Sequence, residues 1–281
     1  MRGGVPVGEF AELSSEEQAR PYSKYYHMEF PRPPEMMELI NNPRPVDPAA
    51  ALSIQRLNDM LNPGPLATET GYCVMPDGSG FVALNHKMPG VTAEMLRWWF
   101  AWFISEDLRY KIWFPRDHMG SEISDEDRQM LSDPAIPLER KLQNPGPGHV
   151  ATESIGAGVA RVVIDFMSPE DFGFDMSRYH SPNVATTVCG NVVVPPAGPD
   201  QQPQYVGLLH FARDMSGGVD FRTRFWMGYQ IVDKEPVLML APGTRIPEEA
   251  CFGLYEHDVH EYSRLAGFLP QLYREQGGRI D

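Results

Sequence analysis

The feature that most constrains the fold of this chain is a series of strand-like segments that ends in one long helix. After His149 the sequence has β-branched, aromatic or alternating stretches at residues 159–167, 185–194, 205–213, 220–232 and 237–240. Such stretches are typical of strands. A Ser-Gly-Gly turn at residues 216–218 predicts a hairpin between two of them, and a helix that begins near Pro247 closes the chain. The order predicts a long antiparallel meander followed by a C-terminal helix.

The segment before the meander supplies two more strands and a pair of helices. Residues 71–75 and 80–84 flank a Pro-Asp-Gly-Ser turn, which predicts a strand–turn–strand unit. Thr92 can cap a Trp-rich helix that runs to about Tyr110, and residues 124–131 form a polar helical stretch. An antiparallel sheet that curves around a terminal helix encloses a cavity. We therefore predict an α+β protein with the Bet v 1-like helix-grip fold.

The N-terminal region differs from the rest because it is rich in proline. Its prolines include Pro21, Pro31, Pro33, Pro34, Pro43, Pro45, Pro48, Pro63 and Pro65. One helix is credible there, with Asp47 as N-cap, Pro48 in the first turn and residues 49–61 as its body. We predict an arm at residues 1–68, which packs on a neighbour or a second subunit, and a main domain at residues 69–281.

Composition excludes several classes of partner. The 281 residues carry 24 Lys and Arg against 38 Asp and Glu, a net charge of −14, which argues against nucleic acid because phosphate binding needs clustered basic residues. No apolar run approaches the roughly 18 residues of a membrane span. The first residues lack the apolar core of a signal peptide, so we expect a cytoplasmic protein. The three cysteines lack the spacing of a metal finger.

His257 and Glu261 are the most informative polar pair of the chain. On a helix they lie one turn apart on the same face. That face continues as Leu265, Phe268, Leu269 and Leu272. An inward-facing pair of this kind needs a partner, and a divalent metal satisfies both groups. The alternative is a buried His–Glu hydrogen bond. His260 lies about 60° from His257 around the helix, so geometry leaves a His257–His260 pair open.

Further ligands would come from other parts of the chain. His118 follows the Trp-rich helix, with Asp117 beside it to orient or replace it, and Glu153 begins the strand region. His210 alternates with apolar residues on a strand, so it faces either the cavity or the surface. His86 occurs in a turn-like context, where we expect it to be solvated.

Other catalytic signatures are missing from the sequence. It has no Gly-x-Ser-x-Gly elbow, phosphate-binding loop, dinucleotide fingerprint or His-Glu-x-x-His motif. The two kinds of functional site that remain compatible with the sequence are a metal site and a ligand-binding pocket without a metal.

Four blocks of the sequence stand out in order. They are Met88-Pro-Gly-Val-Thr-Ala-Glu-Met-Leu-Arg-Trp-Trp-Phe100, Arg109-Tyr-Lys-Ile-Trp-Phe-Pro-Arg-Asp-His118, Glu153-Ser-Ile-Gly156 and His257-Asp-Val-His-Glu261. Together they resemble a known family, the zinc-dependent carbon–carbon hydrolases of the 2,4-diacetylphloroglucinol hydrolase and phloretin hydrolase type. The resemblance covers about residues 70 to 262. It implies a Bet v 1-like catalytic domain and a small N-terminal part involved in dimerisation, and hence a homodimer.

The resemblance also implies the site residues. A zinc ion held by two histidines and two glutamates matches His118, Glu153, His257 and Glu261. Tyr110 matches a family tyrosine that contacts a phenolic hydroxyl of the substrate. Ser121 stands where the family has an asparagine that touches the substrate. His210 and Tyr229 are placed as further polar residues of the pocket.

These residues lead to one preferred hypothesis and two alternatives. The preferred function is zinc-dependent hydrolysis of the bond between an acyl group and a polyhydroxylated aromatic ring, which releases a carboxylic acid from a phenolic ketone. Zinc would supply hydroxide near neutral pH, and Tyr110, His210 and Glu153 would be the catalytic groups. The alternatives are a helix-grip protein that only binds a hydrophobic ligand, and a metal-dependent decarboxylase or cyclase of a polyketide.

Overall fold

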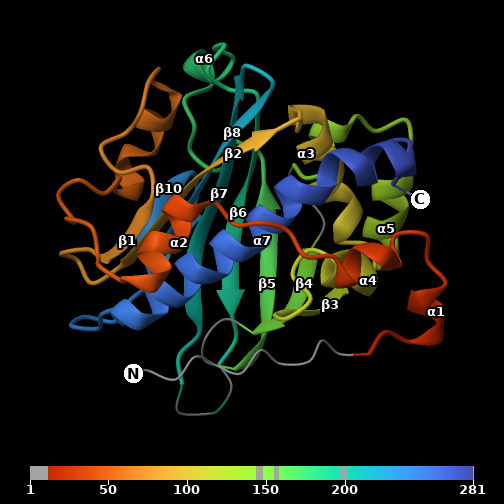
Figure 1. Cartoon of the computed structure of the whole chain (residues 1–281). Coiled ribbons are helices and arrows are strands. Elements are labelled where there is room, and N and C mark those ends of the chain that lie inside the picture. The colour runs from red at the N-terminus through yellow and green to blue at the C-terminus, as the bar shows by residue number, and fades with distance from the viewer. Residues whose placement is uncertain (1–11, 144–147, 155–157, 197, 199–200, 281) are drawn as a thin grey trace.

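The computed structural model is built on one large antiparallel sheet and a long C-terminal helix (Figure 1). It describes residues 12–143, 148–154, 158–196, 198 and 201–280, so the end of the block that begins at Glu153 lies outside the described residues. The sheet has eight strands in the order β1-β2-β8-β7-β6-β5-β4-β3. The strands are β1 Gly71–Val74, β2 Gly80–Pro89, β3 His118–Glu122, β4 Gly148–Ser154, β5 Val159–Met167, β6 Thr186–Val194, β7 Gln204–Met215 and β8 Gly218–Met227.

The helix α7, Glu248–Gln276, lies against one face of this sheet (blue in Figure 1). It packs on β1 and β2 at one edge of the sheet. Its residue His257 reaches the opposite edge, where the Nε2 atom of His257 lies 3.3 Å from the Nε2 atom of His118 in β3. Because one helix contacts both edges, the sheet must curve around it. The predicted α+β class and helix-grip arrangement are therefore confirmed.

The predicted meander is correct in its main part, with one interruption. Strands β4 to β8 pair in sequence order, and Gly217 adopts a φ of 77° in the predicted hairpin turn. The single strand predicted for residues 220–232 is wrong. Gly228 has a φ of 96°, a conformation that glycine adopts without strain, and there the chain leaves the sheet. The next strands, β9 Tyr229–Val232 and β10 Glu235–Leu238, form a separate two-stranded sheet.

The single helix predicted to begin at Thr92 is two helices. Thr92 accepts a hydrogen bond from the Met95 amide and caps α3, Ala93–Phe103. The backbone becomes extended at Glu106, and α4, Asp107–Lys111, starts there. The polar stretch at 124–131 forms α5, Asp125–Ser132, as predicted.

The N-terminal region is more structured than predicted, but the helix expected over residues 49–61 is wrong. The region contains α1 Ser15–Gln18, η1 Ser23–His27, α2 Pro34–Asn41 and η2 Ile54–Leu61. Asp47 caps only a turn, by accepting from the Ala49 amide at 2.9 Å. The backbone is extended at Ser53, so the 3₁₀ helix η2 starts afresh after it. The domain boundary at residue 68 and the homodimer stay predictions.

Alternating side chains give the sheet two cores, because successive residues of a strand point to opposite faces. On β7, Leu208 and Ala212 join the inner core under α7 and α3. Leu209 and Phe211 join the outer core, which η2 covers. The chemistry described below lies on the inner face. No helix of the described residues is long and apolar enough to cross a membrane.

Arg264 of α7 joins three segments of the chain. Its guanidinium donates to the carbonyls of Tyr25 and Met28 in the N-terminal region, and to those of Ile112 and Trp113 before β3. The side chain is buried, so these acceptors have little access to water. Arg264 therefore fixes the approach of the chain to His118.

We expect Arg264→Leu to lower the free energy of unfolding by about 2–4 kcal/mol, because it leaves several buried carbonyls without a donor. Urea denaturation measures this. The matched control is Arg274→Leu on the exposed face of the same helix, with a change within about 0.5 kcal/mol. Equal effects of the two substitutions would show that Arg264 has no special role.

Candidate metal centre

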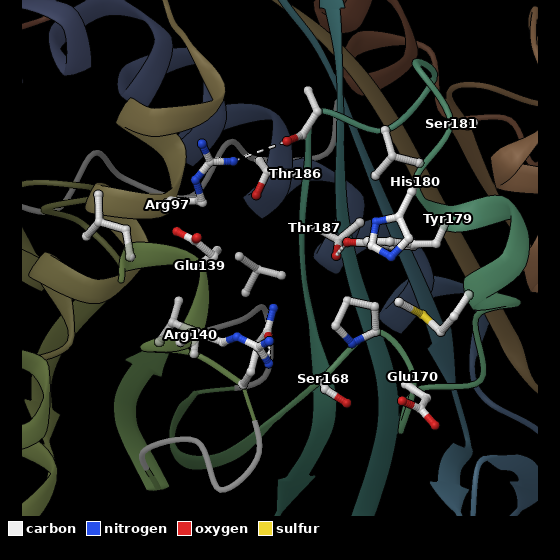
Figure 2. Close-up of a pocket in the computed structure, with 18 residues that line it drawn as sticks. Arg97, Glu139, Arg140, Ser168, Glu170, Tyr179, His180, Ser181, Thr186 and Thr187 are labelled. Carbon is white, nitrogen blue, oxygen red and sulfur yellow. Dashed lines mark hydrogen bonds between the residues drawn. The ribbon is translucent and has the colours of Figure 1, made fainter. Parts of the chain in front are cut away.

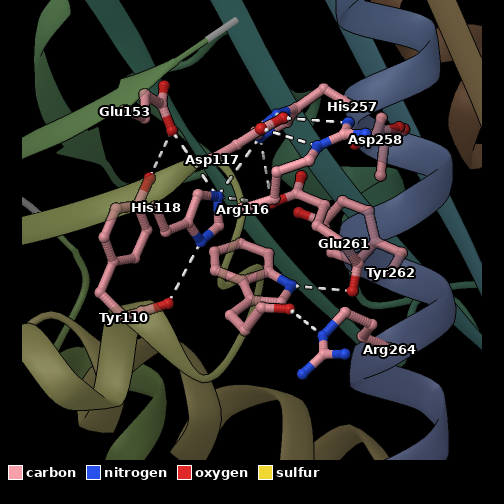
Figure 3. Close-up of polar contacts among 12 residues, drawn as sticks. Tyr110, Arg116, Asp117, His118, Glu153, His257, Asp258, Glu261, Tyr262 and Arg264 are labelled. Atoms are coloured by element: carbon pink, nitrogen blue, oxygen red, sulfur yellow. Dashed lines mark hydrogen bonds and ion pairs between the residues drawn. The ribbon is translucent and has the colours of Figure 1, made fainter. Parts of the chain in front are cut away.

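Three buried side chains, one from the edge strand β3 and two from the helix α7, converge on one point (Figure 3). They are His118, the first residue of β3, and His257 and Glu261 of α7. The two histidine Nε2 atoms lie 3.3 Å apart, and Glu261 Oε2 lies 3.4 Å from Nε2 of His118 and 3.7 Å from Nε2 of His257. Tetrahedral bonds of 2.0–2.1 Å separate two ligand atoms by roughly 3.3–3.4 Å. The spacing therefore fits a zinc-sized cation.

Neighbouring acceptors fix the tautomers of both histidines. His118 Nδ1 lies 3.2 Å from the Tyr110 carbonyl oxygen, which can only accept a hydrogen bond. His257 Nδ1 lies 3.2 Å from Asp117 Oδ2. Each Nδ1 therefore carries a proton, and the Nε2 atoms are the ring nitrogens that face each other and can bind a metal. Such outer partners are typical of metal-bound histidines. Asp117 thus orients His257 and not His118.

A simple hydrogen bond does not explain the pair His257–Glu261. The Nε2–Oε2 distance of 3.7 Å exceeds the roughly 2.7–3.2 Å of an N–H···O hydrogen bond. The three ligand atoms instead stand at the separations that one shared zinc-sized cation requires. The structure therefore favours the metal interpretation over the hydrogen-bond alternative.

Burial shifts the pKa values of His118 and Glu261. It lowers the pKa of His118 well below the usual value, with a further contribution from His257, so the imidazole is neutral and can act as a ligand. Burial, together with Asp258 and Glu153, raises the pKa of Glu261 well above the usual value. A divalent cation would offset this clustering of carboxylates.

Glu153 and Tyr110 flank the three residues. Glu153 lies directly opposite His118 in the β3–β4 register, and its Oε2 is 3.8 Å from His118 Nε2. The Tyr110 hydroxyl donates a hydrogen bond to Glu153, while its ring stacks on His118 with centroids 3.9 Å apart. Burial and the nearby Glu153 raise the pKa of Tyr110 well above its usual value, so the hydroxyl stays a donor.

Asp258 is a member of the cluster that sequence reasoning missed. It is fully buried, hydrogen-bonded to Glu261, and accepts from Thr223 Oγ1 at 2.5 Å. Burial raises its pKa to about 7. Its position next to His257 was visible in the sequence, but its contact with β8 depends on the fold.

Ser121 is not part of the cluster in the structure. Its hydroxyl donates to the Ile104 carbonyl at 2.8 Å and accepts from His149 Nε2 at 2.9 Å. Both partners are internal to the protein, and the predicted substrate contact of Ser121 stays a prediction. His149 is a residue that the sequence reasoning did not single out. It lies on the same inner face of β4 as Glu153 and packs edge-on against Tyr110.

His210 faces the interior, which settles the alternative left open by the sequence. It lies 3.0 Å from the hydroxyl of Tyr262 and stacks on Phe100, so its hydrogen bond and ring contact are with residues outside the triad. Burial lowers the pKa of His210 to about 3, so it is neutral near pH 7. It can position Tyr262 as a hydrogen-bond partner.

Position in the fold bears on three other expectations. Tyr229 belongs to the outer core, where its hydroxyl bonds to Asp77 and Gln55, so the structure places it apart from the triad, and its substrate role stays a prediction. His260 stacks on Phe114 and lies outside the metal cluster, so the structure selects His257. His86 is buried in β2 rather than solvated.

The inner core continues up to the cluster. Val192, Val206 and Phe225 of the sheet and Leu254 of α7 belong to it. Leu254 lies one turn before His257, so an apolar side chain precedes the candidate metal centre on the same helix.

The fold and the cluster together define a helix-grip protein with a candidate metal-binding triad. The chain belongs to the family described as the DAPG hydrolase PhiG domain, whose model matches residues 52–274. The prediction of this family is confirmed.

Curated relatives extend over nearly the whole chain. Phloretin hydrolase of Eubacterium ramulus is 31% identical over 277 residues, which cover 97% of this chain and 95% of the relative. A 2,4-diacetylphloroglucinol hydrolase of Pseudomonas sp is 29% identical over 273 residues, which cover 92% and 89%. The predicted hydrolase class is therefore confirmed. Among solved structures, the crystal structure of Ara h 8.0201 matches 69% of this chain and 99% of its own, at 9% identity and a TM-score of 0.41.

We expect purified protein to hold about one divalent metal ion per chain, and His257→Ala to hold almost none, because one of three converging ligands is lost. Elemental analysis by mass spectrometry measures the metal. The matched control is His260→Ala, which removes a buried histidine of the same helix and should keep its metal. Loss of metal from the His260 variant alone would contradict the assignment.

Proposed function

We propose that this chain is a zinc-dependent hydrolase of an acylphloroglucinol-like ketone. It would cleave the carbon–carbon bond between the acyl group and the polyhydroxylated ring. The observation that carries the proposal is the convergence of two histidine Nε2 atoms and Glu261, in a chain whose relatives are named as hydrolases of phloretin and 2,4-diacetylphloroglucinol.

The donor set supports zinc as the metal. His118, His257 and Glu261 would hold it, a two-histidine and one-carboxylate set that is typical of catalytic zinc with one open position. When bound, zinc supplies a Lewis acid and a water that ionises near neutral pH. Glu153, the predicted fourth ligand, is hydrogen-bonded to Tyr110, which supports a role beside the metal rather than on it.

The overall reaction adds water across one bond. The oxygen of water joins the carbonyl carbon, the bond from that carbon to the ring breaks, and the ring carbon takes up a proton. A phloroglucinol-type ring can accept the electron pair because its hydroxyl groups tautomerise to ketones. The products are a carboxylic acid and the free phenol, and no oxidant or reductant is needed.

Glu153 can carry the proton that the reaction moves. Its carboxylate lies beside the triad, so it can take a proton from the attacking water and return it to the ring carbon. Tyr110 keeps its proton because its pKa is raised. Its hydroxyl donates to Glu153 in this structure and would turn to donate to a phenolic oxygen of the substrate.

The direct test is a panel of phenolic ketones that includes phloretin, 2,4-diacetylphloroglucinol and a benzene ring with one hydroxyl and one acyl group. We expect release of the carboxylic acid from polyhydroxylated members, loss of activity with chelator, and recovery with added zinc, all followed by chromatography. The ring with one hydroxyl should react far more slowly, because it cannot tautomerise easily.

Two outcomes would contradict the proposal. Full activity after complete metal removal would exclude a metal-dependent hydrolysis. Tight binding of these ketones without turnover would favour a ligand-binding protein, and loss of carbon dioxide from an added polyketide acid would favour a decarboxylase.

We expect Tyr110→Phe to lower kcat by about 10²-fold, because the ring still stacks on His118 while the hydroxyl donor is lost. Steady-state kinetics with the best substrate of the panel measure this, and the metal content should not change. The matched control is Tyr229→Phe, which removes a hydroxyl in the outer core and should leave kcat within about twofold. A similar loss in both variants would point to a general structural effect.

A further inference from the structure

A pocket of about 690 Å³ lies between Arg97 in the middle of α3 and the start of β6 (Figure 2). Its other walls are the 3₁₀ helix η3, Leu138–Arg140, and the helix α6, Met176–Tyr179. None of the lining residues belongs to the metal triad. The volume falls within the roughly 300–1,000 Å³ of small-molecule sites.

The charged side chains of this pocket leave a positive excess. Arg97 and Arg140 contribute two positive charges and Glu139 one negative charge, while Glu170 is already paired with Lys234 at 2.7 Å. In the part of the chain that the structure describes, neither arginine forms an ion pair. Arg97 donates to the Ala185 carbonyl at 3.2 Å, and its remaining N–H groups are left for a ligand.

The opposite wall offers an apolar platform. Tyr179 is held in place because its hydroxyl is hydrogen-bonded to Thr187 at 2.5 Å. Met176, Pro169 and Val184 line the pocket around its ring. Figure 2 shows Tyr179 across the hollow from Arg97 and Arg140. A fixed ring with apolar neighbours on one side and guanidinium groups on the other suits a molecule with one apolar and one anionic end.

We propose that this pocket binds a small aromatic carboxylate. The carboxylate lies between Arg97 and Arg140, since guanidinium groups pair with carboxylates through two parallel hydrogen bonds. The apolar body packs on Tyr179 and Met176. The proposal that this pocket binds such a carboxylate rests on the lining of the pocket alone. The natural ligand would be the carboxylic acid that the enzyme releases, and this part of the proposal rests on the proposed function.

The test is calorimetric titration of the full-length protein with 3-phenylpropanoate and with its neutral analogue 3-phenylpropanamide. We expect the carboxylate to bind and the amide to bind at least about tenfold more weakly, because the amide cannot form the charge-assisted pair. Arg140→Gln should weaken carboxylate binding by about tenfold for the same reason. Arg140 is exposed, so thermal unfolding should confirm an intact fold.

Two controls locate the binding. Arg161→Gln removes an exposed arginine that pairs with Glu122 elsewhere on the sheet and should bind like the parent protein. His257→Ala damages the metal centre and should also bind normally. Loss of binding in the His257 variant, equal binding of acid and amide, or no effect of Arg140→Gln would each overturn the proposal. A protein that binds the acid through Arg140 but hydrolyses no ketone would refute the proposed function and leave this site standing.

Discussion

The structure depends on the meeting of two imidazole Nε2 atoms in its interior, 3.3 Å apart. His118 and His257 come from the far edge of the sheet and from the C-terminal helix, and each is turned by an acceptor on its Nδ1 side. A cation shared by these two atoms and Glu261 would join the two elements of the fold that carry them.

The fold is organised to bring these groups together. The β3–β4 register places His118 opposite Glu153, and the one-turn spacing on α7 places His257 and Glu261 on the same face. Arg264, one turn further along α7, fixes the segment that leads into β3. The same helix thus supplies ligands and holds the element that carries the third ligand.

Local patterns predicted part of this arrangement, and tertiary contacts decided the rest. Helical spacing was enough to find His257 and Glu261, and strand alternation was enough to find most of the sheet. The family resemblance, rather than spacing, supplied His118 and Glu153. Tyr229 lies apart from the triad because Gly228 turns the chain toward the outer core. The partners of Asp258 and Ser121, 35 and 28 residues away in sequence, follow no local pattern.

The most direct test of the account is X-ray absorption spectroscopy at the zinc edge on the purified protein. The account predicts two imidazole nitrogens and carboxylate or water oxygens at about 2.0–2.1 Å, with no sulfur in the first shell. A sulfur shell near 2.3 Å, or a shell that contains no imidazole, would contradict a centre built from His118, His257 and Glu261.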